Sequence, residues 1–179
     1  IKPSIFETNQ FLEKNEPTLI EYAAFYGSIQ IFHYLLLSGV EIEEKLWLYA
    51  VHSKNAEFIH LLESNLDSID DKEKEKVYLE SIKCHHINLS EYIENNLLNR
   101  YNETINENAE FNKNINLTAL KYCNYLYFPI EIEKNFAFYY LCKYKYSKVV
   151  KLFIKTIKIN EEIKQMSFNQ VIRKEADEN

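Results

Sequence analysis

Glycine and proline are rare in this chain, and their scarcity limits the folds open to it. The 179 residues contain only two glycines, Gly27 and Gly39, and three prolines, whereas average usage would give about a dozen glycines. Sheets joined by tight turns need residues that supply a positive or a fixed φ at each turn. The composition therefore favours helices, and 46% hydrophobic with 27% charged residues is typical of a folded soluble protein.

A short apolar pattern recurs along the chain. It is clearest at residues 18–40, TLIEYAAFYGSIQIFHYLLLSGV, where the small pair Ala23-Ala24 precedes Gly27 and a second apolar run ends at Gly39. The pattern also fits LWLYAVHSKNAEFIHLLES, YLESIKCHHINLSEYIENNL and FYYLCKYKYSKVVKLFIKT, which place at the small position Ala50, Ser81 and Cys142. Each copy predicts two short helices joined by a tight turn.

We therefore predict an all-α chain of about four to five helix-turn-helix units in a single domain over residues 1–179. The units are 17–44, 45–73, 76–100, a degenerate unit 101–130, 134–160 and a partial C-terminal helix 161–173. In the degenerate unit, 95–116 is expected to be a loop or a polar helix, and 117–129 a second helix stopped by Pro129. The segment 5–17 is expected to cap the stack. Because the chain starts at Ile1 and ends in a polar run, we expect it to be a fragment of a longer protein.

Residues 18–40 resemble the ankyrin repeat, whose pattern is T-P-L-H-x-A-A-x-x-G-H-x-x-I-V-x-L-L-L-x-x-G-A. The matching residues are Thr18, Ala23, Ala24, Gly27, Ile31, Leu35, Leu36 and Gly39. Residues 15–100 are similar to an ankyrin-like domain of unknown function that is expanded in certain protists, and 117–160 match it loosely. The chain departs from the pattern where Leu19 and Glu21 replace Pro and His. It departs again at the inter-helix glycine, which is replaced by Lys54, His85 and Lys145.

The resemblance implies an ankyrin-like helical solenoid whose concave side binds another protein. The variable contact positions of that family are the two residues after the small pair. Here they correspond to Phe25, Tyr26, His52, Ser53, Lys83, Cys84, Lys143 and Tyr144. Among these, Phe25 and Tyr26 are expected to contribute most, because aromatic side chains anchor interfaces.

The sequence thus predicts a non-catalytic protein-interaction module that presents a preformed surface, with a partner and an oligomeric state that it does not specify. The alternative is a binder of nucleic acid or of an anionic membrane surface through the Lys- and Tyr-rich segment 134–158, which holds seven lysines and no acidic residue. Its candidate residues are Lys143, Lys145, Lys148 and Lys151. The net charge of −6 disfavours general nucleic-acid binding.

Chemical motifs are sparse. Cys84, His85 and His86 are adjacent, so on a helix they point in different directions and cannot easily hold one tetrahedral zinc ion; a turn is the preferred interpretation. An enzyme that uses Cys84 as nucleophile and His86 as base is a third hypothesis. We predict no enzyme activity, no metal ion and no cofactor. Three cysteines without a CxxC pair indicate a reducing compartment, the cytoplasm or the nucleus.

Overall fold

The computed structural model describes residues 7–65, 69–98, 109–128, 134–156 and 165. These residues form helices and turns and contain no strand, which confirms the prediction of an all-α chain for the described part. The contacts divide the chain into two compact units, unit 1 (residues 1–107) and unit 2 (residues 108–179). The predicted repeat boundaries and the single domain stay predictions.

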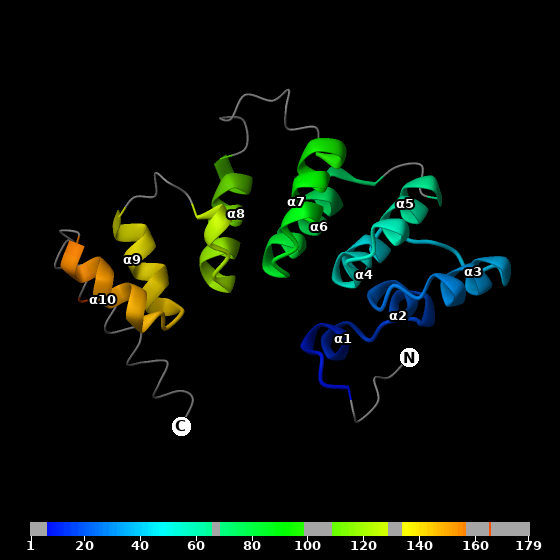
Figure 1. The fold of residues 1–179 in the computed structure, drawn as a ribbon, viewed down its shortest axis with the longest axis horizontal. Coiled ribbons are helices and arrows are strands. Elements are labelled where there is room, and N and C mark those ends of the chain that lie inside the picture. The colour runs from blue at the N-terminus through cyan, green and yellow to red at the C-terminus, as the bar shows by residue number, and fades with distance from the viewer. Residues whose placement is uncertain (1–6, 66–68, 99–108, 129–133, 157–164, 166–179) are drawn as a thin grey trace. The chain divides into compact units, whose positions relative to one another are not determined.

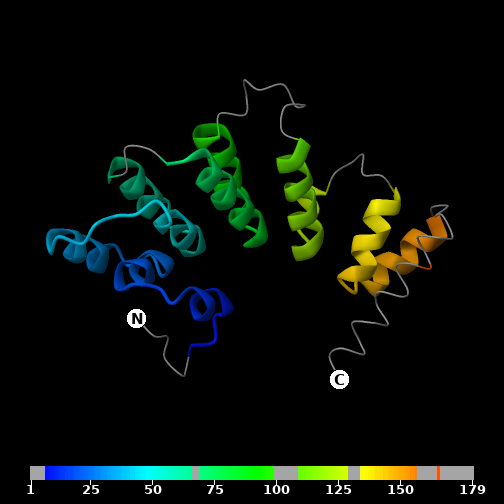
Figure 2. The ribbon, with the colours of Figure 1, turned by 180° about the vertical axis from the view of Figure 1, so that it is seen from behind.

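Unit 1 is built from helix pairs whose first helices pack on one another in order (Figures 1 and 2). Its helices are α1 (Gln10–Asn15), α2 (Leu19–Phe25), α3 (Ile29–Leu37), α4 (Leu46–Ser53), α5 (Ala56–Asn65), α6 (Asp71–Lys83) and α7 (Ile87–Tyr92), the last continued by the π-helix η1 (Ile93–Leu97). Helix α2 contacts α4 and α4 contacts α6, while α3, α5 and α7 each pack against the helix before them.

The pairs of unit 1 share a close-packed core. The small position of the sequence pattern is fully buried at Ala50 and Ser81, so the helices can approach closely there. Between the second helices, the rings of Phe32 and Phe58 meet with centroids 4.6 Å apart, and both are fully buried. The apolar pattern read from the sequence therefore marks the core.

The turn between paired helices keeps one backbone geometry although its residues differ. The residue at the turn has positive φ in each case: Gly27 (63°), Lys54 (54°), His85 (57°), Cys123 (56°) and Lys145 (61°). In four of these turns the next amide donates to a carbonyl five residues back, as in Ser28 to Ala23 (2.8 Å) and Tyr146 to Leu141 (3.0 Å). This bond closes the end of the first helix in the Schellman manner.

Helix α2 begins with a capping box instead of the Pro and His of the ankyrin pattern. The Thr18 amide donates to Glu21 Oε2 (2.6 Å), and the Glu21 amide donates to Thr18 Oγ1 (3.4 Å). Glu21 is buried, and its Oε1 lies 3.1 Å from Lys45 Nζ at the start of the next pair. Two of the backbone amides that a helix start leaves unpaired are thus satisfied locally.

Unit 2 contains α8 (Ala109–Tyr122), the 3-10 turn η3 (Tyr125–Tyr127), α9 (Lys134–Lys143) and α10 (Ser147–Thr156). Phe138 and Cys142 of α9 are buried against Val150 and Phe153 of α10. Helix α8 contacts α9 and buries Phe111, Ile115, Ala119 and Leu120.

The predicted second helix over 117–129 is wrong. Residues 117–122 are the end of α8, which stops where Cys123 takes positive φ and the Asn124 amide donates to Ala119 O (2.9 Å). Tyr125 and Leu126, which fall within the predicted helix, are 65% and 66% exposed. Without a glycine at Cys123, the apolar pattern gave no sign that the helix ends there. Pro129 and all but one residue of the predicted helix 161–173 lie outside the described residues.

The segment predicted to cap the stack contains α1. Phe11 of α1 packs against the first helices of two pairs: its ring centroid is 6.0 Å from that of Phe25 on α2 and 5.1 Å from that of Tyr49 on α4. Leu12 of α1 is fully buried. Among the described helices, none has the length and apolar character that crossing a membrane requires.

Candidate functional site

The predicted contact positions are divided between the two units. Lys143 and Tyr144 belong to unit 2 and are partly buried at the end of α9. The other six belong to unit 1, where the ends of α2, α4 and α6 present them. These are Phe25, Tyr26, His52, Ser53, Lys83 and Cys84. The structure brings Phe25, His52, Lys83 and Cys84 into one cluster. Tyr26 remains exposed.

Two aromatic rings enclose His52 in this cluster. The centroid of the His52 ring lies 4.7 Å from that of Phe25 and 4.4 Å from that of Phe11. Lys83 Nζ stands 5.5 Å from the centroid of the Phe11 ring. Phe11 therefore covers positions that the family resemblance assigns to a partner. Phe11 does not follow from the sequence pattern, because nothing in the segment 5–17 relates it to the repeats.

Beside His52 lie a carboxylate and a thiol from α6. His52 Nε2 is 3.0 Å from Glu80 Oε1, and His52 Nδ1 is 3.5 Å from Cys84 Sγ. Cys84 Sγ also lies 4.0 Å from Glu80 Oε1. Glu80 and Cys84 are four residues apart on one helix, so they share a face. That spacing was the available signal for Glu80, which the sequence analysis did not single out.

The surroundings of this cluster shift two of its pKa values. Burial works against the negative charge of Glu80, but hydrogen bonds from His52 and Lys83 outweigh it and hold the pKa of the carboxyl below its usual value. Burial, helped by the charge of Glu80, raises the pKa of the Cys84 thiol to about 12. At neutral pH the cluster therefore contains an ionised carboxylate and a protonated thiol.

The adjacent residues Cys84, His85 and His86 do not converge on one point. Cys84 ends α6 and faces His52, His85 has positive φ and is exposed, and His86 directs Nδ1 at Val51 O (2.7 Å). The preferred interpretation of these residues as a turn is confirmed.

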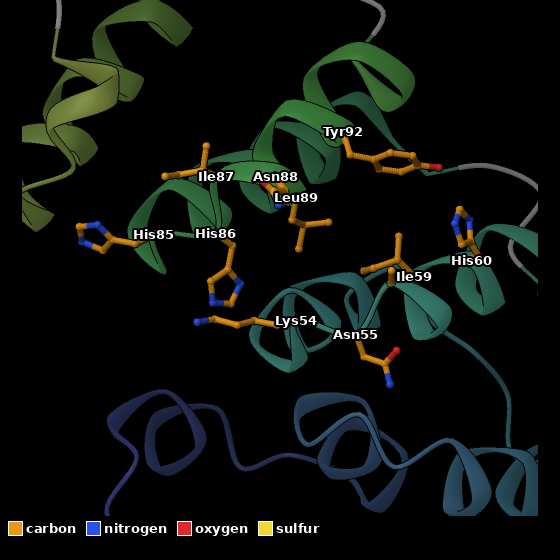
Figure 3. Close-up of a pocket in the computed structure, with 11 residues that line it drawn as sticks. Lys54, Asn55, Ile59, His60, His85, His86, Ile87, Asn88, Leu89 and Tyr92 are labelled. Atoms are coloured by element: carbon orange, nitrogen blue, oxygen red, sulfur yellow. The ribbon is translucent and has the colours of Figure 1, made fainter.

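A pocket of about 540 Å³ opens between α5 and α7 (Figure 3). Ile59 and Leu89 form its apolar floor, Lys54 and His86 lie at its turn end, and Tyr92 lies at the other. Because a carbonyl only accepts, His86 must donate from Nδ1 to Val51 O, which leaves Nε2 as the acceptor of the neutral ring. Burial lowers the pKa of His86 and favours this neutral form.

The first helix pair, α2 and α3, exposes large apolar side chains. Tyr26 is 61% exposed, Tyr34 69% and Leu37 90%, with Leu19 and Ile31 about half exposed. The Tyr26 ring stacks on that of Tyr22 one helical turn away, with centroids 6.4 Å apart and planes at 7°. We call these exposed side chains of α2 and α3 the first-pair surface.

The lysine-rich segment lies on α9 and α10 of unit 2. Its tyrosines stack on one another, for example Tyr140 with Tyr144 at 5.9 Å, and Lys143 Nζ lies 5.3 Å from the Tyr140 ring. Lys148 and Lys151 are exposed on α10 together with Lys155, and none of these three forms an ion pair with a described residue. Lys145 occupies the positive-φ position of the turn.

Comparison with known proteins finds no family model, no curated protein and no solved structure that matches this chain.

Proposed function

We propose that this chain is an ankyrin-like helical repeat domain that acts as a non-catalytic protein-interaction module. Support comes from the turn geometry that recurs at Gly27, Lys54, His85, Cys123 and Lys145. Further support comes from the ordered contacts of α2 with α4 and of α4 with α6 in unit 1. Repeats of this kind bury their faces on neighbouring repeats and leave the remaining surface for a partner.

The first-pair surface is the observation that carries the proposal. Tyr26 and Tyr34 stand out from two helices whose opposite faces are buried at Ala24 and Phe32. Exposed apolar side chains grouped on one element mark interaction sites, and tyrosine is enriched among the residues that dominate binding energy. Stacking on Tyr22 holds Tyr26 in place before binding, so less side-chain entropy is lost when the partner arrives.

The test compares two double variants by affinity capture from a lysate of the cells that make the protein. Tyr26→Ser/Tyr34→Ser removes two anchors of the first-pair surface. Tyr125→Ser/Leu126→Ser removes side chains of similar exposure from unit 2 and serves as the control. We expect one protein to be captured by the wild type and the control but not by the first variant, and its purified form to bind that variant at least about 10-fold more weakly.

Other outcomes contradict the proposal. Capture of no protein, or of a protein held equally by the wild type and Tyr26→Ser/Tyr34→Ser, excludes the first-pair surface. Equal loss in both double variants indicates nonspecific adhesion to apolar surface. Circular dichroism of each variant checks that the helices remain folded.

A non-catalytic role is also supported by the state of Cys84. Its pKa is raised to about 12, and a protonated thiol is a weak nucleophile. We further propose a reducing compartment, the cytoplasm or the nucleus, for which Cys84, Cys123 and Cys142 provide support, since none of these three described residues forms a disulfide.

A second candidate function is binding of a nucleic acid or an anionic membrane surface. The exposed lysines of α10 favour it, since Lys148, Lys151 and Lys155 have no acidic partner among the described residues. This candidate is supported if the chain binds an oligonucleotide with an affinity that falls steeply as salt rises. The slope of log affinity against log salt concentration should decrease by about one for each lysine replaced by Ser. Absence of binding to an oligonucleotide and to anionic vesicles at low salt excludes it.

A further inference from the structure

The cluster of His52, Glu80 and Cys84 combines three kinds of ligand that zinc prefers. A thiol, an imidazole and a carboxylate converge from α4 and α6, and their donor atoms all lie within 4.8 Å of one another. Zinc in proteins is held by these three groups, in sets of four or of three with one open position. None of the three side chains is fully exposed, so they are also shielded from bulk water.

The distances suit a single ion. Ligands at about 2.0–2.3 Å from a tetrahedral zinc ion stand about 3.2–3.6 Å from one another. An imidazole offers one nitrogen to one ion, and with Nε2 of His52 as that ligand the separations are 3.0 Å to Glu80 Oε1 and 3.9 Å to Cys84 Sγ. The remaining pair, Sγ and Oε1, is 4.0 Å apart, so all three separations lie within about 0.5 Å of those of a tetrahedral site.

We propose that His52, Glu80 and Cys84 form a three-ligand site for Zn²⁺ that ties α4 to α6. Glu80 and Cys84 approach the ion from one face of α6, and His52 approaches it from the neighbouring helix. The fourth position is taken by water. This site is separate from the first-pair surface and goes beyond the proposed partner binding.

Metal binding changes the charge of the cluster in a defined way. Zinc binds the thiolate, so the Cys84 proton is released to solvent while the Cys84 sulfur forms a bond to the metal. The carboxylate of Glu80 is already ionised and needs no proton transfer. The proton that His52 Nε2 donates to Glu80 moves to Nδ1, so that Nε2 ligates the ion from a neutral ring. Lys83 Nζ now donates to Glu80 Oε1 at 2.7 Å, and the two oxygens of the carboxylate allow one to ligate zinc while the other accepts from Lys83.

The rings of Phe11 and Phe25 beside the cluster favour an ion held by the three side chains over an ion surrounded by water. Phe11 and Phe25 flank His52 with centroids at 4.4 and 4.7 Å, so they limit the approach of water and fix the plane of the imidazole. A fixed ligand orientation and an apolar shell strengthen metal sites. This arrangement also explains why a histidine and a thiol occupy partly buried positions on stacked helices.

The test uses the full chain with Co²⁺ as a spectroscopic probe and Zn²⁺ as its competitor. We expect Co²⁺ to produce the charge-transfer band of a cobalt–thiolate bond and Zn²⁺ to abolish it. Cys84→Ser should lose the band and weaken zinc affinity by more than about 100-fold, since even outer-shell changes cost 10–100-fold. Cys123→Ser, which alters another partly buried cysteine in unit 2, should bind as the wild type does.

A second variant keeps the proposal falsifiable if Cys84→Ser fails to fold. Glu80→Gln retains the size of the side chain and should weaken zinc affinity while the thiolate band persists. Zinc should also raise the melting temperature of the wild type and of Cys123→Ser, but not that of Cys84→Ser. The proposal is overturned if the wild type gives no thiolate band, if Cys84→Ser binds zinc as tightly as the wild type, or if Cys123→Ser loses the band.

Discussion

The first helix pair, α2 and α3, and the last, α9 and α10, have the same turn and different surfaces. At the turn, Gly27 and Lys145 have φ of 63° and 61°, and the amide of the next residue donates to a carbonyl five residues back, at 2.8 and 3.0 Å. On the surface, α3 exposes Tyr34 and Leu37, whereas α10 exposes Lys148, Lys151 and Lys155 alongside Leu152 and Ile154. One backbone framework thus supports an apolar surface in one pair and a mixed basic and apolar one in the other.

The comparison shows which part of each pair is constrained. Backbone hydrogen bonds fix the turn, so a residue other than glycine can occupy it at a cost of about 1–2 kcal/mol. Outward-facing residues carry no such constraint. We therefore attribute function to the exposed side chains of each pair and folding to the turn and the buried face.

The largest change in the free energy of unfolding is expected from Gly27→Ala, at the turn of the first pair. Its positive φ costs about 1–2 kcal/mol for alanine, and the added Cβ would lie 3.2 Å from Ser53 Cβ and 3.3 Å from Asn55 Cβ. We expect urea denaturation to show a loss of about 2–3 kcal/mol. Gly39→Ala is the control, because Gly39 also has positive φ but nothing lies within 4 Å of its added Cβ. An equal loss in both variants would refute the contribution of crowding.

A smaller loss of stability is expected when a side-chain hydrogen bond is removed that both units make with different donors. The residue after the positive-φ position reaches back to the preceding first helix: His86 donates to Val51 O at 2.7 Å, and Tyr146 donates to Lys121 O at 2.6 Å. His86→Ala and Tyr146→Phe should each cost about 0.5–1.5 kcal/mol, the larger loss at the more buried His86. Thermal unfolding monitored by circular dichroism measures both. A loss in only one variant would show that the bond is not a shared element.

The sequence was sufficient to predict the helices and turns wherever apolar spacing was clear. At Lys54, His85 and Lys145 the alignment identified the turn residue without a glycine, because the buried small positions Ala50, Ser81 and Cys142, three or four residues earlier, kept the register. The degenerate unit was misread at Cys123, where no glycine marks the end of α8 and only Asn124 follows as a turn-forming residue. Periodicity of apolar residues identifies a buried face but not the residue at which a helix ends.

The residues around His52 could be predicted from the sequence only in part. Positions of Phe25, His52 and Cys84 follow from the repeat, so their convergence on stacked helices was within reach of sequence analysis. Phe11 comes from a segment outside the repeat pattern, and Glu80 differs little from other exposed-looking glutamates on α6. Contacts between such residues depend on tertiary packing, which single-sequence patterns do not encode.

A modest gain is expected from restoring glycine at a turn that lacks it. Lys54→Gly relieves the cost of positive φ but adds entropy to the unfolded chain, so we expect a gain of about 0.5 kcal/mol. The matched control is Lys148→Gly within α10, where glycine should destabilise by about 1 kcal/mol. Urea denaturation of both variants separates the two situations. A loss of stability in Lys54→Gly would contradict the strained turn.

The pH dependence of stability is expected to show the smallest effect, and its sign follows from His86. Burial lowers the pKa of His86 below its usual value, helped by the charges of Lys54, His52 and His85. The unfolded chain therefore binds more protons, and stability falls as the pH drops below about 6.5 until His86 is also protonated in the folded state. In His86→Ala the fall over this window should be shallower. Identical slopes in both proteins would contradict this assignment.

The central claim, that a protein partner binds the first-pair surface, is tested most directly by hydrogen exchange. The exchange of backbone amides is followed by mass spectrometry for the full chain alone and with the partner that affinity capture identifies. We expect protection from exchange to increase in residues 19–38 and to remain unchanged in 134–156. Protection that increases only in 134–156, or in neither segment, would contradict the claim.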